Sequence, residues 1–401
     1  MLKILDLFAG AGGLSLGFEG TKQFEVVAIV ENNKNAAKTY LRNHPGLKNY
    51  EDILTADFQQ IKRECGNIDV IIGGPPCQGF SNANRQRRHL INGSNELVKK
   101  YVEAIRELQP KAFVMENVKT IASSKHSFCV THADENHVKN VLHLNVYPKE
   151  VTLYEGENVE RIFELVCRND KQIEELLLIS EDDLYFLYNM CKKKERIKKL
   201  LSKVENYKIL KAIEEKLVID DRFPEWYNQC TYQAKKVLAE LVENKGAENT
   251  FGVDAIRKFW DVHRFFHGIA ELERKDAVFT YTISEHSIRV KMQTYIVIDY
   301  IKASFRYLGY ETKGDVLNAA DYGVPQNRKR LIFMGIREDL GEPEFPIPTF
   351  TVNPNSLYIS SLILYASFIG SSYNNFIPVI SMKHSSIEYL SITGEYLHKI
   401  L

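Results

Sequence analysis

The chain has 401 residues, which is too long for one ordinary domain and suggests two or three. Hydrophobic residues make up 44% and charged residues 26%, a balance typical of a soluble, globular protein. There is neither an apolar run long enough to cross a bilayer nor a secretory signal, so we expect a cytoplasmic protein. The 52 basic and 52 acidic residues cancel, which argues mildly against a nucleic-acid enzyme but does not exclude a local basic patch.

The cysteines are scattered along the chain. None of the six belongs to a C-x-x-C pair, so the pattern fits neither a disulfide framework nor a zinc site, and we expect no metal. Reduced thiols are the simplest interpretation for five of them: Cys65, Cys129, Cys167, Cys191 and Cys230.

The first 120 residues alternate between strand and helix patterns. We expect strands at 2–8, 24–30, 67–72 and 111–115, with a helix at 94–109 that Ser94 caps. This order predicts an α/β fold with a Rossmann-like, doubly wound, mostly parallel sheet. Ligands of such sheets bind at the carboxyl ends of the strands. Four features fall there: the glycine turn at 8–13, Glu31, the segment 73–81 and the triplet 116–118.

The character of the chain changes after this first part. Residues 124–292 are rich in charge, with leucine and isoleucine at helical intervals, and predict a mainly helical insertion with strand-like pieces at 147–154 and 277–283. The α/β pattern resumes with a helix at 295–310 and a strand at 328–336. We therefore divide the chain into a core in two parts, an insertion and a tail without clear architecture: 1–123 and 293–350, 124–292, and 351–401.

The glycine turn, DLFAGAGG at 6–13, resembles a dinucleotide-binding turn but has Ser15 where the third glycine would stand. Glycines still let a nucleotide-like ligand approach the backbone, Glu31 could hold ribose hydroxyls, and Asp52 could meet an adenine edge. The alternative is a tight strand-to-helix turn that binds nothing.

The segment GGPPCQGFS, at 73–81, mounts Cys77 behind two prolines and between glycines. A cysteine that only fills a core needs no such mounting, so we expect a reactive thiol. The sequence NANRQRRH follows at 82–89 and contains no acid, which would suit phosphate binding. A solvated basic loop and a buried structural cysteine are the alternatives.

Two further groups complete the set of candidates. Glu116, in ENV, would project from the end of the strand next to the one that precedes Cys77, and it could act as an acid or a hydrogen-bond donor. Arg328 and Arg330 alternate in QNRKR after Gln326, so we expect their side chains to share one face of a strand. Arginines recognise planar acceptors, although alternating arginines on an edge strand can also simply favour solubility.

Together and in this order, DLFAGAGG, GGPPCQGFS, ENV and DYGVPQNRKRLIF resemble four diagnostic motifs of the cytosine-C5 DNA methyltransferases. The resemblance covers about residues 1–120 and 293–340. It implies a class I methyltransferase fold and S-adenosylmethionine as cofactor, with double-stranded DNA as substrate. The positions that it assigns to the cofactor are Phe8, Ala9, Gly10, Gly12, Gly13, Leu14, Glu31, Asn32, Asp52, Ile53 and Pro75.

The resemblance also implies the catalytic roles. Cys77 would attack C6 of a flipped cytosine, Glu116 would hold and protonate the N3 side, and Arg330 would steady both. Gln326 and Arg328 would support the site. DNA contacts would come from Gln78, Ser81, Arg85, Arg87 and Arg88.

The chain departs from the family pattern in two respects. It inserts residues 124–292 where the family has a short connection, and the family's C-terminal recognition and cofactor-pocket parts are not recognisable after residue 350. We expect the modification component of a restriction–modification system, either as one subunit of a split enzyme or as a truncated product. Less favoured is an insertion that has taken over DNA recognition. The alternatives in function are a transfer-RNA cytosine-5 methyltransferase and a non-catalytic subunit that binds cofactor or DNA.

Overall fold

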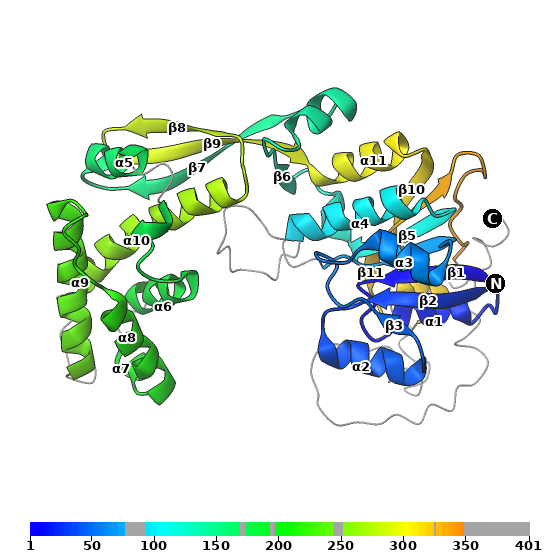
Figure 1. Cartoon of the computed structure of the whole chain (residues 1–401), viewed down its shortest axis with the longest axis horizontal. Helices are drawn as coiled ribbons and strands as arrows, with labels where there is room; N and C mark the ends of the chain where they lie inside the picture. Colours follow the sequence, from blue (N-terminus) through cyan, green and yellow to red (C-terminus); the bar gives the residue numbers. More distant parts are fainter. Residues whose placement is uncertain (77–93, 169–172, 193–196, 244–251, 325, 349–401) are drawn as a thin grey trace.

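The computed structural model describes residues 1–76, 94–168, 173–192, 197–243, 252–324 and 326–348, which form two lobes (Figure 1). The core lobe contains a seven-stranded sheet in the order β10-β11-β5-β4-β1-β2-β3. Strands β3, β2, β1, β4 and β5 are parallel, and β11 and β10 continue the sheet antiparallel. The strands span Leu2–Leu7 (β1), Phe24–Val30 (β2), Lys48–Asn49 (β3), Val70–Gly73 (β4), Ala112–Val118 (β5), Tyr310–Asn318 (β10) and Lys329–Arg337 (β11).

Helices cover both faces of this sheet because successive side chains of each strand point to opposite faces. In β1, Leu5 and Leu7 pack into one hydrophobic cluster with α3, α4 and α11, whereas Ile4 packs into another with α1 and α2. The five helices are α1 (Gly13–Glu19), α2 (Lys34–Asn43), α3 (Phe58–Cys65), α4 (Ser94–Leu108) and α11 (Val297–Tyr307). The predicted α/β class with a doubly wound, mostly parallel sheet is therefore confirmed. Ser94 is the first residue of α4 rather than its cap.

The second lobe, here called the insertion lobe (residues 127–296), contains its own antiparallel sheet. Its strands are β6 (Ser127–Cys129), β7 (Tyr147–Glu155), β8 (Phe279–Ser284) and β9 (Ser287–Ile296), and β9 pairs with all three others. Its helices are α5 (Val159–Arg168), α6 (Glu181–Lys192), α7 (Ile197–Leu201), α8 (Val204–Lys216), α9 (Glu225–Glu243) and α10 (Val253–Arg274). No helix in the described residues is long and apolar enough to span a membrane.

The predicted strands at 147–154 and 277–283 are confirmed as β7 and β8, but the sequence interpretation missed β9. The predicted helix at 295–310 is wrong at its start, because residues 295 and 296 end β9 and the helix α11 begins at Val297. The period of two was present in β9, with Ile288 and Val290 buried and Arg289 and Lys291 exposed. Surrounding charge and helical patterns concealed it.

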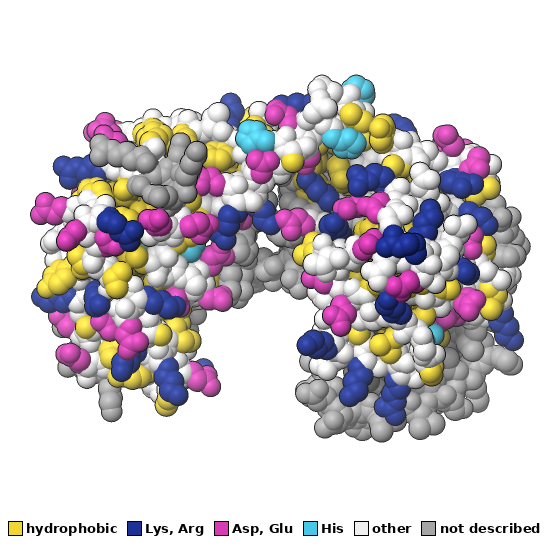
Figure 2. Space-filling model, in the orientation of Figure 1, with side chains coloured by type: hydrophobic (Ala, Val, Ile, Leu, Met, Phe, Trp, Pro, Cys, Tyr) yellow, Lys and Arg dark blue, Asp and Glu magenta, His cyan; other side chains and the backbone are white. Residues whose placement is uncertain are grey.

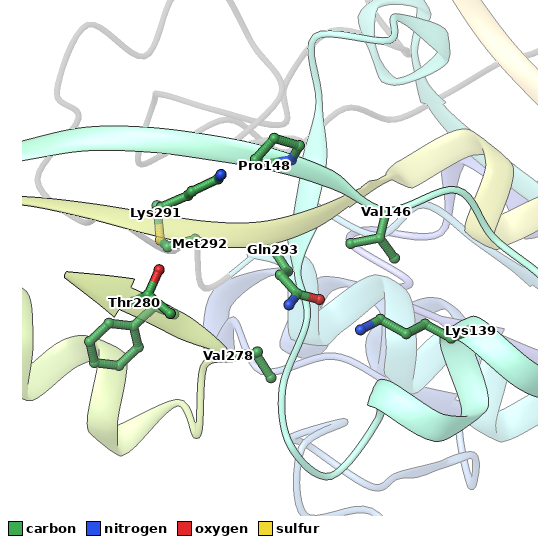
Figure 3. A pocket seen from close by; sticks show the side chains of 9 residues that line it. Lys139, Val146, Pro148, Val278, Thr280, Lys291, Met292 and Gln293 are labelled. Atoms are coloured by element: carbon green, nitrogen blue, oxygen red, sulfur yellow. The ribbon is translucent and has the colours of Figure 1, made fainter. Parts of the chain in front are cut away.

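The two faces of the second sheet differ. One face packs on α5 and α10 in a continuous hydrophobic cluster. The other face borders a pocket of about 470 Å³, where Lys139, from a short π-helix at His137–Val141, lies near Gln293 and Val278 (Figure 3). This pocket belongs to the insertion lobe alone.

The arrangement of the two lobes places the core sheet's carboxyl edge opposite the insertion lobe. The parallel strands β1, β4 and β5 end on the side of the core that faces the insertion lobe (Figure 1). Below the connection between the lobes, Figure 2 shows a broad cleft open on one side. The candidate residues at the strand ends therefore lie on the cleft side of the core.

A buried carboxyl group supports the turn that follows β1. Asp6 is 1% exposed, and its Oδ2 lies 3.4 Å from the Tyr40 hydroxyl, whose single proton is shared between this carboxyl group and Ser15 Oγ at 2.7 Å. Burial raises the pKa of Asp6 from 3.8 to about 7, because the desolvated carboxylate is unfavourable. The nearby charges of Glu19 and Glu31 raise the pKa further, while the hydrogen bonds lower it.

The raised pKa of Asp6 predicts that the folded protein loses stability as the pH rises. Above pH 3.8 the carboxyl group of the unfolded chain releases its proton, but the folded protein keeps it up to about pH 7. The stabilisation that this proton gives to the folded state is therefore complete at low pH and is lost as the pH rises to about 7. In the wild type, Asp6 should lower the free energy of unfolding by roughly 4 kcal/mol between about pH 4 and about pH 8, and Asp6→Asn should abolish this decrease. Urea unfolding at several pH values measures this.

The control for this experiment is Asp57→Asn, the same chemical change at the exposed cap of α3. Hydrogen bonds, chiefly from the backbone of Gln60, lower the pKa of Asp57, so its titration lies below pH 3.8 and the slope at neutral pH should not change. Parallel pH profiles for wild type and Asp6→Asn would contradict the prediction.

Candidate active site

The glycine turn after β1 has an open space above it. Gly10 and Gly12 have φ angles of 56° and 95°, in the left-handed region that favours glycine. A Cβ atom on Gly12 would lie 3.0 Å from the Tyr40 ring, so that glycine is also needed for packing. In contrast, a Cβ atom on Gly10 or Gly13 would meet no atom within 4 Å. The turn therefore offers unobstructed backbone at the sheet edge, as a ligand that approaches the main chain requires.

Glu31 connects this turn with the start of α2. Its carboxylate accepts hydrogen bonds from the backbone N–H groups of Gly10 (2.8 Å) and Asn33 (2.7 Å). The Asn49 side chain holds the Glu31 backbone in turn, accepting from its N–H at 3.0 Å and donating to its carbonyl at 2.9 Å. Glu31 is half-buried, so its carboxylate is fixed beside the glycine turn while part of the residue stays accessible.

The other candidates for the cofactor surround the same edge. Asp52 accepts a hydrogen bond from the Leu54 N–H at 2.9 Å and is half-buried, whereas the neighbouring Ile53 is buried. Asn32 is exposed. Fixed carboxylates beside an open glycine turn fit a ligand with hydroxyl and amino groups. The remaining candidates contact the hydrophobic core or are buried. Phe8 and Leu14 pack against the two core clusters, and Ala9 and Pro75 are buried.

An ion pair forms where β5 and β11 lie side by side. In the antiparallel register, Glu116 is opposite Ile332 and Arg330 is opposite Val118, so the two charged residues project from one face. Arg330 Nε lies 2.7 Å from Glu116 Oε1. The side chains are 27% (Arg330) and 31% (Glu116) exposed, which leaves the pair within reach of a ligand.

The same carboxylate lies against the start of the cysteine segment. A Cβ atom on Gly74 would stand 3.0 Å from Glu116 Oε2 and 3.3 Å from the Glu116 carbonyl oxygen, so the chain passes close to this residue. The buried Asn117 donates from Nδ2 to the Pro75 carbonyl at 3.0 Å. The chain is thereby held at Glu116 directly before Cys77. Cys77 itself, with the DNA candidates Gln78, Ser81, Arg85, Arg87 and Arg88, lies outside the described residues.

The structure separates Arg328 from Arg330. The predicted strand at 328–336 begins one residue later, at Lys329, so the expectation that both arginines share a strand face is wrong. Arg328 instead belongs to the preceding turn, where its N–H donates to the Gln326 carbonyl at 3.0 Å and its own carbonyl accepts from Ala319 at 2.9 Å. Arg328 is exposed and Gln326 half-buried.

Sequence reasoning missed the residues that hold the candidates in place. Asn49 fixes Glu31, Asn117 fixes Pro75, and Tyr40 packs under Gly12. The only available signal was position, since Asn117 directly follows Glu116 and Asn49 stands at the end of the short β3.

Comparison with known proteins identifies the family to which this chain is similar. The model for C-5 cytosine-specific DNA methylases matches residues 2–267 and 289–377. The type II methyltransferase M.XorII of Xanthomonas oryzae pv. oryzae is 41% identical over 127 residues, which are 30% of this chain and 29% of that protein. M.FnuDI of Fusobacterium nucleatum is 33% identical over 178 residues, or 43% of this chain and 48% of that protein.

The alignments with these relatives span about half of their length or less. Among solved structures, DNMT2 of Spodoptera frugiperda is 24% identical over 38% of this chain and 43% of its own, with a TM-score of 0.27. The family model, in contrast, matches most of the sequence on both sides of a short gap. The chain therefore belongs to the C-5 cytosine-specific DNA methylase family.

Proposed function

We propose that this chain is the catalytic polypeptide of a DNA cytosine-5 methyltransferase that uses S-adenosylmethionine and serves a restriction–modification system. The observation that carries the proposal is the Glu116–Arg330 ion pair, whose carboxylate lies against Gly74 at the start of the cysteine segment. An accessible carboxyl group and a guanidinium at one sheet edge, with a cysteine three residues after Gly74 in the sequence, suit covalent catalysis on a pyrimidine. The family match and the type II relatives support DNA as the substrate.

The glycine turn would hold the cofactor. The open backbone at Gly10 and Gly13 would lie against it, Glu31 would accept hydrogen bonds from its ribose, and Asp52 would face its adenine. When bound, S-adenosylmethionine supplies an electrophilic methyl group on a sulfonium and leaves as a neutral thioether. The chain's own part is to place that methyl group beside the strand end that carries Glu116.

Cys77 would supply the covalent step. Its thiolate forms a bond to C6 of a cytosine that has left the helical stack, and the electron pair moves into the ring, where protonation at N3 by Glu116 neutralises it. Arg330 would hold the Glu116 carboxyl and the base in one plane. C5 would then accept the methyl group that the cofactor supplies. A solvent base would remove the C5 proton, the electron pair of that C–H bond would form the C5=C6 double bond as the C6–S bond breaks to return the thiolate, and N3 would give its proton back to the Glu116 carboxylate.

The decisive assay follows methyl transfer and covalent trapping together. We expect labelled methyl to pass from S-adenosylmethionine to duplex DNA, and duplex DNA with 5-fluorocytosine to form a stable adduct that Cys77→Ser abolishes. The chain is assayed alone and with the product of the adjacent gene, since a second subunit could supply target recognition. Transfer to transfer RNA alone, or failure of both transfer and trapping in both settings, would overturn the proposal.

The Glu116–Arg330 ion pair leads to a second prediction, which concerns the rate of methyl transfer. Glu116→Gln removes the proton donor while keeping its shape, so the rate of methyl transfer should fall by roughly 10²- to 10⁴-fold. Arg330→Met should slow transfer as well, since it releases the carboxyl group. The dissociation constant of S-adenosylmethionine, measured by calorimetry, should change little for either variant.

The matched control is Arg337→Met, at the other end of the same strand, which breaks an exposed ion pair with Asp339. Surface pairs of this kind contribute little to stability, so this variant should keep wild-type activity. If Glu116→Gln methylated DNA at the wild-type rate, Glu116 would have no catalytic role.

A further inference from the structure

The insertion lobe touches the core at the first turn of α4, the helix that follows the cysteine segment along the chain. Glu96 lies in this turn and Lys99 follows three residues later, so the two share one side of the helix. Lys275, directly after α10, forms an ion pair with Glu96, and Asp134, after β6, forms one with Lys99. Two segments of the insertion lobe thus bind one helical turn.

The contact at Lys99 is more than a surface ion pair. Its amino group lies 5.7 Å from the ring centroids of both Phe128 and Tyr295, and each of these residues is 0% exposed. Asp134 also accepts hydrogen bonds from the Tyr295 hydroxyl (3.1 Å) and from the Thr131 N–H (2.8 Å). A cation held by a carboxylate and two aromatic faces has a defined position.

The two segments that carry these contacts also bind each other. The backbone N–H of His132 donates to the Asp276 carbonyl at 2.9 Å, and that of Ala133 donates to the Asp276 carboxylate at 3.0 Å. Val278 donates to the Val130 carbonyl at 2.8 Å. We call residues 127–134 and 275–278 the stalk. A displacement of the insertion lobe would therefore reach Glu96 and Lys99 through both parts of the stalk together.

The helix α10 extends this connection across the lobe. It runs from Val253 to Arg274 between the second sheet and the other helices, and Lys275 follows its last residue. The lobe that forms one side of the cleft in Figure 2 is thereby joined, through one long helix, to the first turn of α4. An ordinary linker would need neither the paired charges nor the aromatic cage.

We propose that the stalk contacts Lys275–Glu96 and Lys99–Asp134 are positioning elements, which set α4 according to the placement of the insertion lobe. Through the hydrogen bond of 3.0 Å from the Tyr101 hydroxyl to the Val114 carbonyl, α4 in turn positions β5, the strand that carries Glu116. The proposal rests on the proposed function, because it concerns the covalent step on cytosine. Lys275, Glu96, Lys99 and Asp134 are not catalytic residues in this account. They act through α4.

A charge exchange at the more exposed pair tests this. Lys275→Glu and Glu96→Lys should each slow covalent trapping on 5-fluorocytosine DNA by roughly ten- to a hundredfold, since small displacements of reacting groups cost rates of this order. The double variant, which restores the pair with reversed charges, should recover most of the rate. The S-adenosylmethionine dissociation constant and the melting temperature should stay close to wild type in all three.

The control is Lys139→Glu, which breaks an ion pair of 2.5 Å with Glu135 beside the stalk without touching α4. It should trap DNA at the wild-type rate. Single variants that trap normally, or a folded double variant no faster than the single ones, would overturn the positioning role. A wild-type chain that neither traps nor methylates DNA, alone or with the adjacent gene product, would instead overturn the proposed function and with it this inference.

Discussion

The pairing of β11 with β5 is the constraint on which the rest of this molecule depends. Glu116 lies near the end of β5 and Arg330 near the start of β11, with the whole insertion lobe between them in sequence. Only the antiparallel register brings the two charges to one face, at an N···O distance of 2.7 Å. If this register slipped by one residue, Arg330 would point to the opposite face and the site would lose its cation.

This constraint explains why the insertion lobe leaves and rejoins the core at nearly one place. β6 follows soon after Glu116, and β9 pairs with β6 before it continues directly into α11. The chain can then return to β10 and β11 without disturbing the sheet. A large lobe attached in this way leaves the pairing of β11 with β5 intact, and its contacts with α4 are the route to the site that we propose.

The sequence predicted the parts of this structure that have local patterns. Apolar runs such as Val70–Ile72 and the period of α4 identified the core sheet and its helices, and the strand ends located Glu31 and Glu116. β9 was missed because its alternation stands between charged segments. Arg328 was misplaced because a local turn, through the bond from its N–H to Gln326, ends before the strand begins.

The pairings between distant residues could not be predicted from patterns. Glu96 and Lys275 are 179 positions apart, and nothing in either neighbourhood indicates the other. The same holds for Asn117 and Pro75, whose contact depends on how β4 and β5 lie in the sheet. The family resemblance suggested that Glu116 and Arg330 act together, and the strand register gives the physical reason for their contact.

The most direct test of the central claim is a structure of the chain bound to duplex DNA that contains 5-fluorocytosine. The account predicts a bond between Cys77 Sγ and C6 of a base outside the helical stack, with the Glu116 carboxyl group at hydrogen-bonding distance from N3 and Arg330 still paired with it. A base held elsewhere, or an adduct remote from Glu116 and Arg330, would contradict it.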